Sequence, residues 1–307
     1  MRQMLDAART LSRYAWLSIA ASIVTVLLKL AAWRLTGSVG LLSDAMESLI
    51  NVGAAVMLLA MLRIAARPSD DGHAYGHSKA EYFASGFEGV LVVVAAGGIA
   101  YAATLRLLHP RPVEYAGFGL AITIVASAVN FVVARILMRA GRQHRSIALE
   151  ADARHLMTDV WTSGGVVLGV TLVVLTGWLV LDPLIALAVA VNIIFIGWRL
   201  LKESILGLMD AAWSADDQAE LQRVLGEYRA RGIDFHAVRT RRAGARRFAS
   251  FHVLVPGAWT VQQGHDLLED IERRIAERFV SVTVDTHLEP AEDPTSYQDE
   301  GLERDRR

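Results

Sequence analysis

Long apolar stretches separated by short polar breaks occupy the first two thirds of the chain. A hydrocarbon core about 30 Å thick requires roughly 20 apolar residues in one helix. Glycine, proline and charged residues, which favour turns, fall between the stretches. Six stretches are long enough to cross a bilayer: 14–35, 39–65, 81–108, 113–138, 150–177 and 183–208. This pattern predicts a membrane α-helical bundle of six transmembrane helices.

A different pattern begins after residue 209, where helical spacing of apolar residues alternates with short period-2 runs typical of half-buried strands. The segments follow the order helix, strand, strand, helix, strand: 216–229, 235–241, 248–255, 261–278 and 281–288. We therefore predict a small α+β (αββαβ) domain with its helices on one face of a sheet. The residues after Pro290 are polar and are expected to be disordered.

Basic residues are concentrated at one end of the predicted transmembrane helices. They lie at the N-terminus and at or beyond the C-terminal ends of the second, fourth and sixth stretches. These residues are Arg2, Arg9, Arg13, Arg63, Arg67, Lys79, Arg135, Arg139, Arg142, Arg145, Arg199 and Lys202. The opposite ends hold Arg34, Arg106 and Arg111. The positive-inside rule therefore places both termini in the cytoplasm. We expect a transmembrane domain, a cytoplasmic metal-binding and dimerisation domain and a disordered tail: 1–209, 210–290 and 291–307.

Composition supports a membrane bundle with a soluble appendage. The chain is 53% hydrophobic and 21% charged, with a mean hydropathy of +0.34. Its net charge of −1 gives no sign of nucleic-acid binding. Because the chain has no cysteine, disulfides and thiolate metal sites are excluded, and any metal must be held by His, Asp, Glu, Asn or water.

Two of the predicted membrane helices carry side chains that bind metals. Asp44, Glu47 and Asn51 share one helix face, as do His155 and Asp159. Polar groups in hydrocarbon are costly, about 2.5–3.5 kcal/mol for a charge on insertion scales, so five of them in two helices indicate a common use. If the faces meet, they supply a tetrahedral Zn²⁺-type site or a looser oxygen-rich shell for Mn²⁺ or Fe²⁺. The alternative is hydrogen bonding within the bundle or at helix ends.

A second candidate metal site lies in the loop after the second stretch. Asp70, His73 and His77 fall within eight residues of a glycine-containing segment. Two imidazoles and one carboxylate are typical of a zinc site with an open position. A solvated polar loop is the alternative interpretation.

The cytoplasmic domain offers a third set of candidate metal ligands. It contains His236, His252, His265 and His287, and Glu289 follows two residues after the last of these, on the same face of a predicted strand. Ordinary surface or core histidines are the alternative to a shared cation site.

Lys79 and Asp210 form a further candidate pair, which is structural. One precedes the third predicted helix and the other follows the sixth, so both lie at the cytoplasmic boundary. A salt bridge between them would fasten the bundle at the domain junction. Two unrelated interfacial charges are the alternative.

Six segments together resemble the cation diffusion facilitator family: GSVGLLSDAMESLINVGAA, DDGHAYGHSKAE, ADARHLMTDVWTSGGV, FHAVRTRRAG, RFASFHV and VDTHLEP. The similarity covers nearly the whole chain, from about residue 12 to 290. It implies six transmembrane helices, a cytoplasmic metallochaperone-like domain and a homodimer. It also implies a secondary transporter rather than an enzyme, which exports Zn²⁺, Fe²⁺, Mn²⁺, Co²⁺ or Cd²⁺ in exchange for protons by alternating access.

The resemblance assigns roles to the candidate residues. The transport site it implies consists of Glu47, Asn51, His155 and Asp159. The loop site it implies consists of Asp70, His73 and His77. The cytoplasmic site, shared across the dimer, consists of His236, His252, His265, His287 and Glu289. Lys79 and Asp210 match the charged pair that fastens the bundle near the dimer contact.

One position departs from the family pattern. Members usually carry Asp where this chain has Asn51, and Asp or His where it has Glu47. An amide cannot titrate and is a weak ligand. Asp44, one turn before Glu47, is a candidate to compensate for the missing carboxylate at position 51. This departure leaves the identity of the transported metal undecided. Zn²⁺ and Fe²⁺ are favoured, and Mn²⁺, Co²⁺ and Cd²⁺ are the other candidates.

The resulting hypothesis is a homodimeric metal/proton antiporter of the bacterial inner membrane, working without a permanently bound cofactor. One alternative is a non-transporting metal sensor or scaffold with a degenerate membrane site. Asn51 is the only feature of the sequence that supports this alternative. A second alternative is an intramembrane zinc hydrolase with Glu47 as base. The hydrolase is disfavoured because the chain lacks an HExxH pattern.

Overall fold

The computed structural model describes residues 2–36, 39–109 and 116–298. It divides into two compact units, Met1–Leu206 and Gly207–Arg307. Each unit has its own core of buried apolar side chains. We describe each of them by itself.

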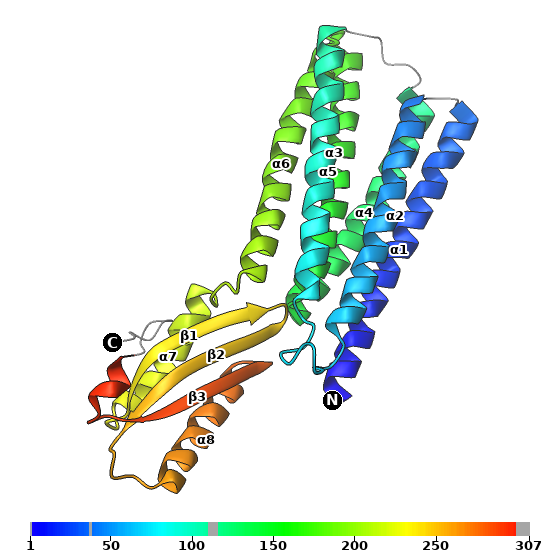
Figure 1. The fold of residues 1–307 in the computed structure, drawn as a ribbon. Helices are drawn as coiled ribbons and strands as arrows, with labels where there is room; N and C mark the ends of the chain where they lie inside the picture. Colours follow the sequence, from blue (N-terminus) through cyan, green and yellow to red (C-terminus); the bar gives the residue numbers. More distant parts are fainter. Residues whose placement is uncertain (1, 37–38, 110–115, 299–307) are drawn as a thin grey trace. The chain divides into compact units, whose positions relative to one another are not determined.

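The first unit consists of long helices, one for each apolar stretch of the sequence (Figure 1). They are α1 (Arg2–Thr36), α2 (Val39–Ala65), α3 (Ala80–Leu108), α4 (Ala116–His144), α5 (Ile147–Thr176) and α6 (Leu181–Leu208). Within the described residues, four segments are long and apolar enough to cross a membrane: Leu11–Ala31, Ala80–Leu108, Ala121–His144 and Pro183–Leu208. This unit is therefore a helical domain of the membrane type.

Small residues let the helices of this unit pack closely. The main core cluster joins α1, α2, α4 and α5 through buried alanines and leucines such as Ala55, Leu58 and Leu137. At the start of α5, the buried carboxylate of Glu81 on α3 accepts hydrogen bonds from Ser146 Oγ (2.5 Å) and the Ala148 N–H (3.5 Å). An acidic group at this position caps the free N–H groups of α5 and complements its dipole. Glu81 is thus a structural carboxylate.

Helices α3 and α6 approach each other at glycines. A Cβ atom on Gly89 would lie 3.1 Å from the backbone nitrogen of Leu201, closer than side chains normally approach. On the next turns of α3, a Cβ atom on Gly97 would meet nothing within 4 Å. Glycine at 89 is therefore a requirement of helix packing, whereas glycine at 97 is not.

We expect Gly89→Val to destabilise the helical unit and Gly97→Val to leave it nearly unchanged. Forcing a side chain into a packed contact costs about 1–3 kcal/mol. The measurement is thermal unfolding of the two purified variants in the same detergent. Equal unfolding temperatures for both variants would contradict the close approach of α3 and α6.

The second unit is a three-stranded sheet with two helices (Figure 1). Its elements are α7 (Ala215–Arg229), β1 (Asp234–Ala243), β2 (Arg246–Val255), α8 (Val261–Arg278) and β3 (Val282–Pro290). The strands lie in the order β1-β2-β3, with β1 antiparallel and β3 parallel to β2. The N-cap residues are Ser214 for α7 and Thr260 for α8, which forms a capping box with Gln263. The helix and strand order agrees with the αββαβ pattern expected from the sequence.

Alternation along β2 gives the sheet one buried and one polar face. Ala249, Phe251, Val253 and Val255 belong to the core cluster that includes the buried side chains of α7 and α8. The residues between them point to the opposite face, which the two helices do not cover. His252 therefore lies on that opposite face, and the register pairs it with His236 of β1 and His287 of β3.

The segment after β3 differs from the expected disorder. Pro294–Tyr297 form a 3₁₀ turn. Ser296 Oγ donates a hydrogen bond to the carbonyl of Pro290 at 2.9 Å, and Tyr297 donates one to the carbonyl of Ala291 at 3.0 Å. These local hydrogen bonds hold residues 291–298 against the end of β3. The polar composition of this segment did not predict this contact. Residues 299–307 lie outside the described part of the chain.

Candidate metal sites

Side chains from α2 and α5 meet in the interior of the helical unit. His155 Nε2 lies 2.8 Å from Asn51 Oδ1, and Asn51 Nδ2 donates to Asp159 Oδ2 at 2.5 Å. Asn51 and His155 are only 5% and 4% exposed. A third helix contributes through Asn130 of α4, whose Nδ2 lies 3.4 Å from the same oxygen of Asp159. The polar faces of α2 and α5 are thus in contact at these residues.

The other two candidates on α2 are placed only by their backbone. Asp44 and Glu47 are helical residues of α2, but their side chains lie outside the described part of the structure. Their roles as ligands therefore stay predictions. Glu47 is one turn before Asn51 on the same helix face.

Two buried carboxylates lie near the same cluster and were not anticipated from the sequence. Glu88 on α3 is 1% exposed and Asp152 on α5 is 2% exposed. Glu88 Oε2 lies 3.4 Å from His155 Nδ1. A lone acidic residue inside the apolar run of α3 was the available signal, because a charge in a membrane helix marks a functional position by default.

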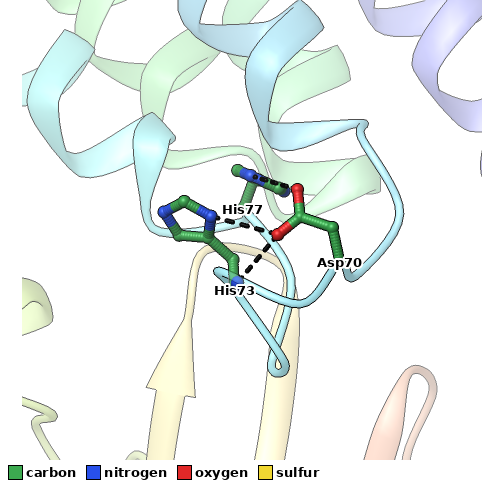
Figure 2. Close-up of side chains that lie close together, drawn as sticks. All are labelled: Asp70, His73 and His77. Carbon is green, nitrogen blue, oxygen red and sulfur yellow. Dashed lines mark hydrogen bonds and ion pairs between the residues drawn. The ribbon is translucent and has the colours of Figure 1, made fainter.

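The loop between α2 and α3 brings its three candidate ligands together (Figure 2). One carboxylate oxygen of Asp70 lies 3.2 Å from His73 Nδ1, and the other lies 3.4 Å from His77 Nε2. Each residue offers one ligand atom within 4.8 Å of the others. The centroids of the imidazole rings of His73 and His77 are 4.3 Å apart. This loop has the donor set of a site for a divalent cation.

Hydrogen bonds fold this loop and keep Asp70 ionised. The N–H groups of Gly72 and His73 both donate to Asp70 Oδ1, at 3.1 and 2.8 Å. Desolvation acts to raise the pKa of the Asp70 carboxyl, but the hydrogen bonds from His73 and the charges of both histidines outweigh it, so the pKa lies below its ordinary value. The carboxylate is therefore in the form that binds a cation.

The polar face of the sheet holds a second cluster of the same kind. Glu289 Oε2 lies 2.7 Å from His236 Nε2 and 3.3 Å from His252 Nδ1. Their ligand atoms lie within 4.8 Å of one another, and the Glu289 residue is 5% exposed. This cluster arises from strand pairing, because His236 and His252 are direct neighbours in the register.

The remaining histidines of this domain contribute unequally. His287 is exposed, and its Nδ1 lies 3.7 Å from Glu289 Oε1, at the edge of the cluster. His265 lies in the first turns of α8 and is exposed. Within this single chain, the described residues place His265 outside the cluster formed by His236, His252 and Glu289. Its role as a ligand stays a prediction.

Lys79 and Asp210 belong to different units of the structure. Lys79 is the residue before α3. Asp210 follows α6 and accepts a hydrogen bond from Arg241 of β1 at 3.3 Å. Their mutual salt bridge stays a prediction.

These features together define a class: a helical protein of the membrane type, with polar side chains in contact between its helices and cation-type ligand clusters in a loop and in a small α+β domain. Residues 15–209 match the family model of the cation efflux transmembrane domain, and residues 213–291 match that of the cytoplasmic domain of cation efflux proteins. The chain therefore belongs to the cation efflux family, the cation diffusion facilitators.

Two curated relatives that are similar over most of the chain agree with this assignment. The chain is 53% identical over 291 residues to the uncharacterized transporter sll1263 of Synechocystis, covering 95% of this chain and 94% of that protein. It is 29% identical over 283 residues to the cation-efflux pump FieF of Escherichia coli K12, covering 92% and 93%. A solved structure titled "Mode of Action of a Putative Zinc Transporter CzrB (Zn form)" is 36% identical, with a TM-score of 0.22, over 24% of this chain and 85% of that one.

Proposed function

We propose that this protein exports a divalent cation from the cytoplasm in exchange for protons, by alternating access across a bacterial inner membrane. The observation that carries the proposal is the buried contact of Asn51, His155 and Asp159 between α2 and α5. In this proposal all six long helices span the bilayer and both termini face the cytoplasm, in accord with the distribution of arginine and lysine.

The cation would be held by Asn51 Oδ1, His155 Nε2, Asp159 and the carboxylate of Glu47. The Asn51 amide bridges His155 and Asp159 through hydrogen bonds. A cation would bind the acceptor oxygens of Asn51 and Asp159 and the Nε2 atom of His155, which must lose its proton to become a ligand. Protons compete with the metal at the imidazole and at the carboxylates, so binding and release of the two are coupled. A state that faces the periplasm and binds protons better would then release the cation there.

The clusters outside the membrane helices would bind the same class of cation. His236, His252 and Glu289 would sense cytoplasmic metal, with His265 and His287 completing the site across a homodimer. A ligand shifts a population only through its different affinity for two states. Occupation of the cytoplasmic site would therefore favour the dimer geometry that binds metal more tightly. The loop cluster of Asp70, His73 and His77 would be a further cation site.

Zn²⁺ and Fe²⁺ suit a membrane site with one imidazole, carboxylates and an amide oxygen, and Mn²⁺, Co²⁺ and Cd²⁺ are the other candidates. The second candidate function is a metal sensor that does not transport. One observation favours it. Among the described residues, groups of three or more His, Asp or Glu ligand atoms within 4.8 Å of one another occur in the loop between α2 and α3 and on the sheet, and not within the long helices.

The deciding experiment is a flux competition among Zn²⁺, Fe²⁺, Mn²⁺, Co²⁺ and Ni²⁺ with the purified protein in proteoliposomes that carry a proton gradient. We expect cation flux coupled to proton movement. A sensor would bind metal in its cytoplasmic domain and give no flux above that of empty liposomes.

Asn51→Asp is expected to change the order of preference among these cations and to tighten binding of the preferred one by about tenfold, which corresponds to 1.4 kcal/mol. The physical reason is that the substitution replaces a neutral amide oxygen with a charged carboxylate at the same position. Gln222→Glu is a suitable control, since it makes the same amide-to-carboxylate change at an exposed position of α7, in the other unit of the structure. An unchanged preference in Asn51→Asp would separate this residue from selectivity.

A further inference from the structure

Glu88 has no evident structural role. It lies in the apolar part of α3 and is 1% exposed. Neither of its carboxylate oxygens accepts a hydrogen bond from any group of the described structure. A buried carboxylate without hydrogen bonds destabilises a fold by several kcal/mol, so a residue retained under that cost has a use. Glu81, two turns earlier, shows the contrast, because one of its carboxylate oxygens accepts hydrogen bonds from Ser146 Oγ and the Ala148 N–H at the start of α5.

The ring of His155 lies between Glu88 and the proposed cation site. Its Nε2 atom faces Asn51 Oδ1 at 2.8 Å, and its Nδ1 atom lies 3.4 Å from Glu88 Oε2. Each ring nitrogen thus has a different polar neighbour from a different helix. Asp152 is also buried on the α5 turn before His155, but among the described contacts the carboxylate that reaches the ring is that of Glu88.

We propose that Glu88 is a positioning residue for the transport site. Nε2–H of His155 donates to Asn51 Oδ1 in this structure, so His155 must give up that proton to bind a cation. Glu88 would then receive the Nδ1–H and so leave the lone pair of Nε2 for the cation. Histidines that bind metals generally donate their other ring N–H to a carboxylate, a carbonyl or water, which sets the tautomer and makes the ligating nitrogen more basic. The distance of 3.4 Å between His155 Nδ1 and Glu88 Oε2 becomes a hydrogen-bond distance after a small movement of the ring toward Glu88. This inference rests on the proposed function.

The test compares Zn²⁺ transport by the wild type, Glu88→Gln, Glu88→Asp and Glu81→Gln in proteoliposomes. We expect Glu88→Gln to raise KM for Zn²⁺ by about 10–100-fold, with a smaller change in kcat, because the second partner of a ligating histidine acts mainly on metal affinity. Glu88→Asp keeps a charged acceptor, whereas the Gln amide oxygen is a neutral and weaker one, so Glu88→Asp should recover part of the loss. The control Glu81→Gln should lower the unfolding temperature and leave KM unchanged.

Stability separates positioning from a structural role. Without metal, Glu88→Gln should unfold near the temperature of the wild type, since the Gln amide oxygen can still accept the Nδ1–H of His155 while a buried charge is removed. A wild-type KM in Glu88→Gln would overturn the proposal. So would a loss of stability in Glu88→Gln equal to that in Glu81→Gln, which would identify Glu88 as a packing residue.

A measurement of Zn²⁺ binding tests the positioning role of Glu88 separately from transport. In a full-length background carrying Asp70→Ala and Glu289→Ala, the rise in unfolding temperature on adding Zn²⁺ reports the membrane site alone. If the wild type gives no flux, the proposed function fails, but a weaker Zn²⁺ effect on adding Glu88→Gln to this background still supports the positioning role. An equal Zn²⁺ effect with and without Glu88→Gln overturns it.

Discussion

Asp159→Ala is expected to reduce cation flux by at least about 100-fold. Asp159 is the charged member of the contact between α2 and α5, and Asn51 and Asn130 both donate hydrogen bonds to it. Removing it takes away a direct charge contact to the cation in a medium of low dielectric constant, and a loss of about 2.7 kcal/mol already gives a 100-fold effect. The measurement is the initial rate of Zn²⁺ flux in proteoliposomes, corrected for the amount of reconstituted protein.

Thr158→Ala is the matched control for Asp159→Ala. Thr158 is also buried on α5, but its hydroxyl donates to the carbonyl of Arg154 one turn earlier and so has no part in the cluster. We expect Thr158→Ala to retain most of the flux. If Asp159→Ala transports as fast as Thr158→Ala, the contact of α2 and α5 is not the transport site.

Glu289→Ala is expected to abolish tight metal binding by the cytoplasmic domain while leaving measurable transport. Its buried carboxylate contacts both His236 and His252. Losing the only acidic member of that cluster should weaken Zn²⁺ binding there by on the order of 100-fold, again about 2.7 kcal/mol. The measurement is calorimetric titration of the full-length protein with Zn²⁺, which should show fewer tight sites per chain.

Glu292→Ala provides the control for Glu289→Ala. Glu292 is three residues further along the chain, is exposed, and accepts a hydrogen bond from the Gly257 N–H at 2.8 Å. We expect the number of tight sites to be unchanged in Glu292→Ala. A full set of tight sites in Glu289→Ala would show that the cluster on the sheet does not bind the metal.

Local patterns were sufficient to predict much of this protein. The apolar stretches became α1–α6, and the alternating runs became β1–β3 at nearly the expected residues. Asp70, His73 and His77 could be recognised because they fall within eight residues, so that a short loop brings them together. His155 and Asp159 could be paired because their spacing places them on one helix face.

Contacts between distant segments were less accessible to prediction. Glu88 is separated from His155 by 67 residues, the difference of their numbers, and nothing in its own helix indicates which neighbour it faces. Asn51 looked like a weakened ligand, yet in the folded chain its amide connects His155 to Asp159. His265 looked equivalent to the other histidines of its domain, but it lies on α8, which covers the opposite face of the sheet from the cluster.

The sequence alone determined the family, the long helices, the α+β domain and most candidate ligands, because each of these depends on local spacing and on the free energy of placing apolar or charged groups in lipid. Only the tertiary structure decided that Glu88 faces the free nitrogen of His155 and that the cytoplasmic cluster centres on Glu289. The physical reason is that such pairings depend on which faces of packed helices and strands meet, and close packing of the whole interior selects them.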